Sequence, residues 1–201
     1  MNVLIVADVL GKENNGTTIA AMNLVRYLRS QGDTVRILCA DQEKKNEKDY
    51  FVVPNLYLGF IANIILKKNF VTLSKPSKKI IKRALDGVDI VHVMLAFPLG
   101  VKTAKIARKM GIPVTAGFHC QAQNFTSHFG LMNCKLANRH VYKHYYKKLY
   151  SKINAIHYPT QFIQDEFGKD VGVFELENKE NLVRFTQGIQ ESSPIDSFVK
   201  V

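Results

Sequence analysis

The sequence predicts an α/β protein with a Rossmann-like parallel sheet that is covered by helices on both faces. Short apolar runs rich in Val and Ile recur along the chain, and a segment with helical periodicity follows each of them, which is the pattern of successive βαβ units. The runs are NVLIVADV at 2 to 9, TVRILCAD at 34 to 41, DIVHVMLA at 89 to 96, IPVTAGFH at 112 to 119 and NAIHYPT at 154 to 160. The chain of 201 residues is also 46% apolar, which is enough to bury a core without disulfides or metals.

The first helix is predicted to begin near Gly16 or Thr17 and to end by Gly32. Its apolar spacing turns five side chains toward the sheet, namely Thr17, Ala21, Leu24, Val25 and Leu28. Later helices are expected at 74 to 85, opened by Ser74 and Pro76, at 98 to 111, closed by Gly111, at about 133 to 152, and after Thr160 as an N-cap.

Two regions have weaker patterns. FVVPNLYLGF at 51 to 60 fits either a strand or a loop. Residues 168 to 201 carry few long apolar runs; VGVFEL at 171 to 176 fits one more strand, and the end of the segment resembles a tail. We therefore expect a folded domain over residues 1 to 167 and a shortened junction or tail over 168 to 201.

The cysteine and hydropathy patterns exclude several classes of protein. Three scattered cysteines and no C-x-x-C pair predict neither a disulfide framework nor a zinc site, and they indicate a reducing compartment. The N-terminal segment MNVLIVADVL lacks the basic leader and cleavage site of a signal peptide. The longest other apolar run, at 55 to 66, is too short to span a bilayer, so no transmembrane helix is expected.

The net charge of +11 indicates an anionic partner such as a phosphate compound, a nucleic acid or an anionic lipid. The charge is concentrated in two segments without acidic residues: 67 to 83 contains seven Lys or Arg, and 135 to 152 contains six. Nucleic acid is the weaker alternative, because no RRM, helix-turn-helix or zinc-finger pattern is present.

The loop before the first helix contains two glycines in ADVLGKENNGTTIAAMN. Backbone N–H groups at a helix start favour a phosphate, so Gly16 and Thr17 are candidates for diphosphate contact. However, the spacing G-x-x-x-x-G is neither the dinucleotide fingerprint nor a P-loop, and Asp41 after the second strand is only a weak ribose candidate without that fingerprint. An ordinary turn that Thr17 helps to cap is the alternative.

Four segments in this order resemble the N-terminal, acceptor-side domain of a family 4 glycosyltransferase with the GT-B architecture. They are VLIVADV, then NNGTTIAAMNLVRYLRSQGDTVRILCAD, then DIVHVMLAFPLGVKTAKIARKMGIPVTAGFH, and then YSKINAIHYPTQFIQDEF. The resemblance covers about residues 1 to 167 and implies the N-terminal half of a GT-B fold. In that family the donor is held mainly by a second domain, so the first loop needs no complete fingerprint.

The resemblance also implies site residues. Gly16 and Thr17 would face the donor diphosphate, and His119 would lie beside the reacting sugar as the catalytic candidate. His92 would line the same cleft from the acceptor side. The segment FHCQAQNFTSHFG at 118 to 130 is expected to be a loop that offers Gln121, Asn124 and His128 to an acceptor sugar, and an ordinary polar loop is the alternative. No cofactor or metal is expected beyond the nucleotide-sugar donor. A Cys120–His119 nucleophilic pair is not expected, because adjacent residues of an extended chain point to opposite faces.

The resemblance implies that a donor-binding C-terminal half is absent from these 201 residues, so the chain alone is expected to be inactive. The predicted function is transfer of a hexose from a nucleotide sugar to a lipid or glycan acceptor, with a separate donor-binding domain as partner. The alternative is a non-catalytic α/β binding module or subunit that partners a separate donor-binding protein. A simple nucleotide-binding Rossmann protein is the third hypothesis.

Residues 135 to 152 predict a strongly amphipathic helix. Two rows of basic residues, with Lys143, Lys147 and Lys148 among them, lie opposite an apolar stripe flanked by tyrosines such as Tyr146. Basic side chains beside interfacial tyrosines are typical of a surface that binds anionic lipid. We therefore expect a cytoplasmic protein that is peripheral at the inner face of the membrane. The alternative is a solvated basic back on a helix whose apolar stripe packs into the core.

Overall fold

The computed structural model describes residues 1–8, 10, 16–56, 74–158, 162, 163, 165, 167 and 198–200. Residues 11 to 15 of the glycine loop, the apolar run from 57, the predicted N-cap Thr160 and the predicted strand at 171 to 176 lie outside the described residues.

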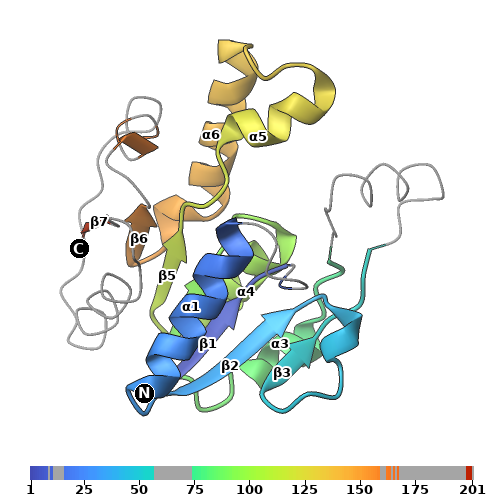
Figure 1. Ribbon diagram of the computed structural model, residues 1–201, viewed down its shortest axis with the longest axis vertical. Coiled ribbons are helices and arrows are strands. Elements are labelled where there is room, and N and C mark those ends of the chain that lie inside the picture. The colour runs from blue at the N-terminus through green and yellow to red at the C-terminus, as the bar shows by residue number, and fades with distance from the viewer. Residues whose placement is uncertain are drawn as a thin grey trace.

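The described strands form one sheet in the order β3-β2-β1-β4-β5-β6-β7 (Figure 1). Their bounds are Asn2–Val6 for β1, Thr34–Cys39 for β2, Tyr50–Val52 for β3, Ile90–Val93 for β4, Val114–Gly117 for β5, Ala155–Tyr158 for β6 and Phe198–Lys200 for β7. Neighbouring strands from β3 to β6 pair in parallel, and β7 pairs with β6 in the antiparallel direction. The predicted Rossmann-like parallel sheet is confirmed.

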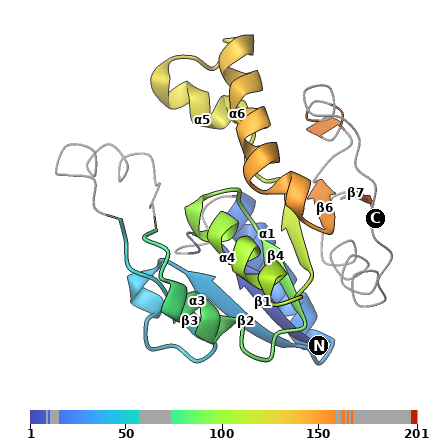
Figure 2. The same cartoon turned by 180° about the vertical axis from the view of Figure 1, so that it is seen from behind.

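Helices cover both faces of this sheet. They are α1 (Gly16–Ser30), α3 (Lys78–Ala84), α4 (Pro98–Lys109), α5 (Ala122–Thr126) and α6 (Lys135–Lys148), with short 3-10 helices at Gln42–Lys44, Ser127–Phe129 and Tyr150–Lys152. Helix α1 lies on one face, and α3, α4 and α6 lie on the other, with α4 between α3 and α6 (Figure 2).

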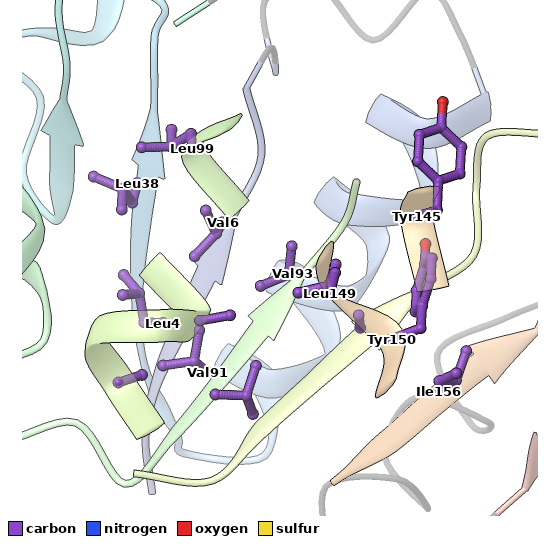
Figure 3. Packing of buried hydrophobic residues seen from close by; sticks show 14 of the residues in the cluster. Leu4, Val6, Leu38, Val91, Val93, Leu99, Tyr145, Leu149, Tyr150 and Ile156 are labelled. Carbon is purple, nitrogen blue, oxygen red and sulfur yellow. The ribbon is translucent and has the colours of Figure 1, made fainter. Parts of the chain in front are cut away.

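Two hydrophobic clusters, one on each face, hold the layers together. The alternation of the central strands divides their side chains, so that Val3 and Ile5 of β1 pack with α1 while Leu4 and Val6 pack with the opposite helices. The labelled residues in Figure 3 show the second cluster: Leu4, Val6, Leu38, Val91, Val93, Leu99, Tyr145, Leu149, Tyr150 and Ile156. The central strands are covered on both sides, which explains their continuous apolar runs.

Several predicted boundaries need correction. Thr18 rather than Thr17 is the first buried side chain of α1, because the helix begins at Gly16 and this phase turns Thr18 inward. Helix α3 begins at Lys78 with Ser77 as its N-cap residue. Ser74 does not open it; this residue forms a β-bridge with Asn55 instead.

Two segments with weak sequence patterns form strands in the structure. The sequence predicted either a strand or a loop for residues 51 to 60. In the structure, Tyr50–Val52 form strand β3. Phe198–Lys200, within the segment expected to be a tail, form β7 at the edge of the sheet. The predicted helix ends are confirmed: Gly32 and Gly111 have φ angles of 81° and 76°, a left-handed conformation that suits glycine after a helix.

Candidate functional site

The strand order reverses between β1 and β4, so the carboxyl ends of these two strands mark the usual ligand position of a parallel α/β sheet. Helix α1 begins at this edge, after the loop that follows β1 (Figure 1). The loops after β4 and β5 leave the sheet at the same edge, because the strands are parallel. The predicted diphosphate contact and the predicted catalytic histidine therefore belong to one edge of the sheet.

Gly16 stands at the first position of α1 and is exposed. A Cβ atom built on Gly16 has no atom within 4 Å, and Gly16 is not among the glycines with positive φ. Neither packing against the described residues nor backbone conformation therefore requires glycine at this position. The first turn of α1 contains no acidic residue, so its positive dipole end is not neutralised from within the turn.

Asp41 follows β2, where a ribose-binding carboxylate would lie in a dinucleotide site. Its Oδ2 accepts a hydrogen bond from the backbone N–H of Leu10 at 2.6 Å. The carboxylate thus ties the loop after β1 to the loop after β2. This structural role, together with the missing glycine fingerprint, argues against the simple dinucleotide-binding alternative.

Asp8 is a buried acid at the same edge that the sequence analysis did not select. It follows β1 and is 1% exposed. The hydroxyl of Ser74 donates to its Oδ1, and the backbone N–H groups of Leu99 and Ser74 also donate to it. Burial raises the pKa of Asp8 from 3.8 to about 6, against these hydrogen bonds, which lower it. The available sequence signal was an acid directly after a buried strand in the first βα loop.

His119 lies two residues beyond β5 and is partly buried. Its ring occupies the space that a side chain at Gly117 would fill: a Cβ on Gly117 would lie 2.4 Å from both Cδ2 and Nε2 of His119. Glycine at the end of β5 therefore permits the observed position of the ring. Burial lowers the pKa of His119 from 6.5 to about 4, so the imidazole is neutral at pH 7.

Two more histidines lie near His119 on neighbouring strands. His157 of β6 pairs in register with Gly117, and its ring stands edge-on to that of His119, with the centroids 5.8 Å apart. Burial, followed by the nearby His119, lowers the pKa of His157 to about 3. The sequence analysis did not select His157, although its position in an apolar run beside two other strand histidines was a signal.

His92 occupies a different position from the one expected. It lies within β4 with no exposed surface, and its Nδ1 is 2.8 Å from the hydroxyl oxygen of Thr115 on β5. Burial, and then the nearby His157 and His119, lower the pKa of His92 well below its usual value. His92 therefore does not line an open cleft, because the strand continues past it and buries its side chain.

The sequence model of Glycosyltransferase Family 4 matches residues 14–175, which is more than half of the chain. The chain belongs to glycosyltransferase family 4. Among solved structures, the crystal structure of MurG from Acinetobacter baumannii is similar at 19% identity, with a TM-score of 0.38, over 58% of this chain and 34% of that chain. This chain thus spans about a third of the length of that protein. No curated protein sequence matches it.

The other polar residues near His119 are less suited to chemistry in this family 4 domain. Gln121 is partly buried as the residue before α5. The Sγ atom of Cys120 lies 4.0 Å from the hydroxyl of Tyr145, and burial raises the pKa of the thiol. A thiol with a raised pKa is a poor nucleophile at pH 7. Gly16, Thr17, His119 and Gln121 therefore stay candidates for contact with substrates, whereas Cys120 is not suited to be a nucleophile.

The basic helix of the family 4 domain is α6, and its basic rows are exposed as predicted. Most of the tyrosines, in contrast, are buried in the core. Tyr142, Tyr145 and Tyr150 are buried, and Tyr146 is partly buried against the same core cluster. The aromatic stripe packs on Phe118 and Phe167, because the helix needs an apolar face against the sheet.

The basic surface extends beyond α6. The exposed Lys and Arg residues of the three helices on this side of the sheet are Lys78, Lys79, Lys82, Arg83, Lys102, Lys105, Arg108, Lys109, Lys135, Arg139, Lys143, Lys147 and Lys148. Helices α3, α4 and α6 contain no Asp or Glu. We call these three helices the basic layer. The two basic segments found in the sequence are separated by α4, but α4 is itself basic.

A metal site and a membrane-spanning helix are both absent from the part of the chain that the structure describes. No group of three or more His, Cys, Asp or Glu side chains there is placed to hold a metal ion. No described helix is long and apolar enough to cross a membrane. A pocket lined by Arg36, Tyr50, Phe51 and Arg83, among others, lies beside β3 and α3. It is away from the carboxyl edge where ligands of this sheet type bind.

Proposed function

We propose that this domain is the acceptor-side part of a retaining glycosyltransferase that transfers a hexose from a nucleotide sugar to a lipid or glycan acceptor. The observation that carries the proposal is the pairing, in a family 4 chain, of an uncrowded glycine at the start of α1 with His119 at the same edge of the sheet. The acceptor hydroxyl would attack the anomeric carbon on the face from which the nucleoside diphosphate departs, so that the configuration is retained. The bond from the anomeric carbon to the diphosphate would break with its electrons going to the diphosphate, and a diphosphate oxygen would accept the proton of the hydroxyl.

The start of α1 would contact the diphosphate of the donor. Its first backbone N–H groups have no acceptor within the helix, and the dipole favours negative charge, so they would stabilise the diphosphate as charge develops on it. The dinucleotide glycine fingerprint is missing, and Asp41 is bonded to Leu10. We therefore propose that a separate donor-binding domain holds the nucleoside and most of the donor.

His119 would act beside the reacting sugar as a neutral imidazole. A ring with a pKa of about 4 is uncharged at pH 7, so it can donate one hydrogen bond and accept another. A hydrogen bond to a sugar hydroxyl would orient the anomeric carbon toward the acceptor, which lowers the entropic part of the barrier. Gly117 would fix the place of the ring by leaving the space that it occupies.

The basic layer would attract the domain to the anionic inner face of the cytoplasmic membrane, where a lipid acceptor would be found, and α6 would be the helix in contact with the headgroups. Thirteen exposed Lys and Arg without an acid in the three helices give charge complementarity to anionic headgroups. Each basic side chain near such a surface contributes about 1 kcal/mol to binding. The contribution is screened over about 8 Å at physiological ionic strength, so binding should fall with salt.

Gly16→Val in the complete enzyme is expected to lower kcat/KM for the donor by about tenfold, which is about 1.4 kcal/mol, and to leave folding unchanged. The added side chain has open space among the described residues, so it would crowd the diphosphate rather than the protein. Steady-state kinetics with varied nucleotide sugar, together with thermal unfolding, would measure both effects.

The matched control is Ser30→Val, which adds a β-branched side chain at the exposed other end of α1. It should leave donor kinetics unchanged. If the Gly16→Val enzyme is well folded and has wild-type donor kinetics, the loop before α1 is an ordinary turn that does not contact the donor.

A further inference from the structure

Five large apolar side chains are exposed at one end of the molecule. Their exposed fractions are 44% for Phe125, 67% for Phe129, 46% for Leu131, 49% for Met132 and 80% for Leu136. We call them the apolar tip. They lie on α5, on the short 3-10 helix after it, on the connecting turn and at the start of α6. This helical hairpin projects beyond the carboxyl edge of the sheet (Figures 1 and 2).

The hairpin that carries the apolar tip is held by specific hydrogen bonds. Asn138 of α6 is 8% exposed; its Oδ1 accepts from the Thr126 hydroxyl at 2.6 Å, and its Nδ2 donates to the carbonyl of Met132 at 2.8 Å. The hydroxyl of Tyr142 donates to Oε1 of Gln123 at 2.8 Å. The buried polar contacts face inward between the helices, so the fold itself presents the apolar side chains outward.

The charges around the apolar tip favour one kind of occupant. Residues 119 to 134 contain no Lys, Arg, Asp or Glu, and Lys135, Arg139 and Lys143 follow on the first turns of α6. No acidic residue occurs anywhere from 90 to 164. An uncharged apolar end next to an acid-free basic helix complements a surface with an apolar interior and anionic headgroups, which is an anionic bilayer.

We infer that the apolar tip inserts into the acyl boundary of an anionic membrane while the basic residues of α6 contact the headgroups. The side chains that enter the lipid are therefore those of the tip and not the tyrosines of α6, which pack on the core. Insertion at the hairpin brings the carboxyl edge of the sheet, with α1 and His119, toward the membrane side of the domain. This inference deepens the proposed function, because that edge is where a lipid acceptor would be used.

The chain contains no tryptophan, so Phe129→Trp creates a single fluorescent reporter at the tip. On vesicles of phosphatidylcholine with phosphatidylglycerol, its emission should shift to the blue, and lipids brominated in the upper acyl chain should quench it. The matched reporter is Met110→Trp, at a residue 48% exposed after the far end of α4, which should show neither effect. Vesicles of phosphatidylcholine alone should shift neither reporter.

Loss-of-function variants separate the apolar contribution from the charge. Phe129→Ser combined with Leu136→Ser should weaken binding to the anionic vesicles by at least about tenfold without a change in charge, whereas Met110→Ser should not. Replacing Lys143, Lys147 and Lys148 by Glu should abolish binding. Circular dichroism of each variant should match that of the wild type, because all these positions are exposed.

Three results would overturn the inference. They are an unshifted Phe129→Trp emission on vesicles that bind the chain, equal binding by the double Ser variant, and a blue shift that depends on protein concentration without vesicles. The last result would show that a second copy covers the tip. The experiment contains no donor or acceptor sugar, so its failure would leave the proposed transfer reaction untouched.

Discussion

Lowering the pH from 7 to 5 is expected to destabilise this domain. Burial lowers the pKa values of His92, His119 and His157, to about 4 for His119 and about 3 for His157. In the unfolded chain these groups titrate near 6.5, so as the pH falls below 6.5 the unfolded state binds protons that the folded state does not. The stability that the neutral rings provide above pH 6.5 is therefore lost on acidification.

The size of this effect follows from the linkage relation. At pH 5 a buried imidazole with the lowered pKa of His157 disfavours the folded state by about 2 kcal/mol. His119, which is partly exposed, contributes less, and His92 acts in the same direction. Such a loss is a substantial part of the total stability of a typical domain, which is about 5–15 kcal/mol. Asp8 acts in the opposite direction: its raised pKa makes the folded state gain relative stability as the pH falls from about 6 to 3.8, which offsets only about one imidazole.

Urea denaturation at a series of pH values would measure the number of protons bound on unfolding. His157→Gln should reduce that number by close to one between pH 5 and 6, because it removes one neutral buried ring. A free energy of unfolding that stays constant from pH 7 to 5 would show that His92, His119 and His157 are not buried as neutral rings.

His119→Ala in the complete enzyme is expected to lower kcat by about a hundredfold with little change in the KM of the acceptor. A group that orients the reacting sugar contributes more in the transition state than in ground-state binding. Steady-state kinetics with both substrates varied would separate the two constants. A loss confined to thermal stability would show that His119 only packs against His157.

Gly117→Ala provides an independent variant for the same claim, because it leaves the imidazole in the protein but displaces it. The new Cβ would lie 2.4 Å from two ring atoms of His119, so the ring must rotate away. The ring is the far end of a flexible side chain, so stability should change little while turnover falls. In a double-mutant cycle, Gly117→Ala should add nothing to His119→Ala, and additive losses would exclude a shared role.

The parallel sheet could be predicted from the sequence because central strands buried on both faces leave continuous apolar runs such as NVLIV and IVHV. Helix ends at Gly32 and Gly111 were also predictable, since few residues other than glycine adopt positive φ there. The basic rows of α6 followed from helical periodicity alone. The family prediction rested on the order of four segments, and the family match confirms it.

What could not be predicted depends on contacts between distant segments. The burial of Asp8 depends on Ser74, which is 66 positions away, so neither residue signals it locally. The sequence predicted His92 at the end of its strand, beside an open cleft, because the apolar run does not indicate where β4 ends. In the structure β4 continues to Val93 and His92 is buried. The tyrosines of α6 fitted either a membrane border or a core, and only the position of Phe118 and Phe167 shows that they face the core.

The apolar tip could not be predicted from the sequence for a related reason. The stretch FHCQAQNFTSHFG was expected to be a loop that offers polar groups to an acceptor, but Ala122–Thr126 form α5 and turn Phe125 outward. Five helical residues are too few for periodicity to indicate which side is buried. The hydrogen bonds of Asn138 show which side of the hairpin is buried, and the apolar side chains lie on the opposite, exposed side.

If the start of α1 contacts the diphosphate of a nucleotide-sugar donor, as proposed, amide-resolved NMR on the 15N-labelled chain should detect the contact. Titration with UDP and GDP to millimolar concentration should shift the amides of Gly16, Thr17 and Thr18, with weak affinity because most of the donor contacts are proposed to lie on another domain. Uridine and guanosine should not shift them, and Gly16→Val should reduce the shifts. Unmoved amides at the start of α1 across the whole titration, or equal shifts with the unphosphorylated nucleosides, would contradict the account.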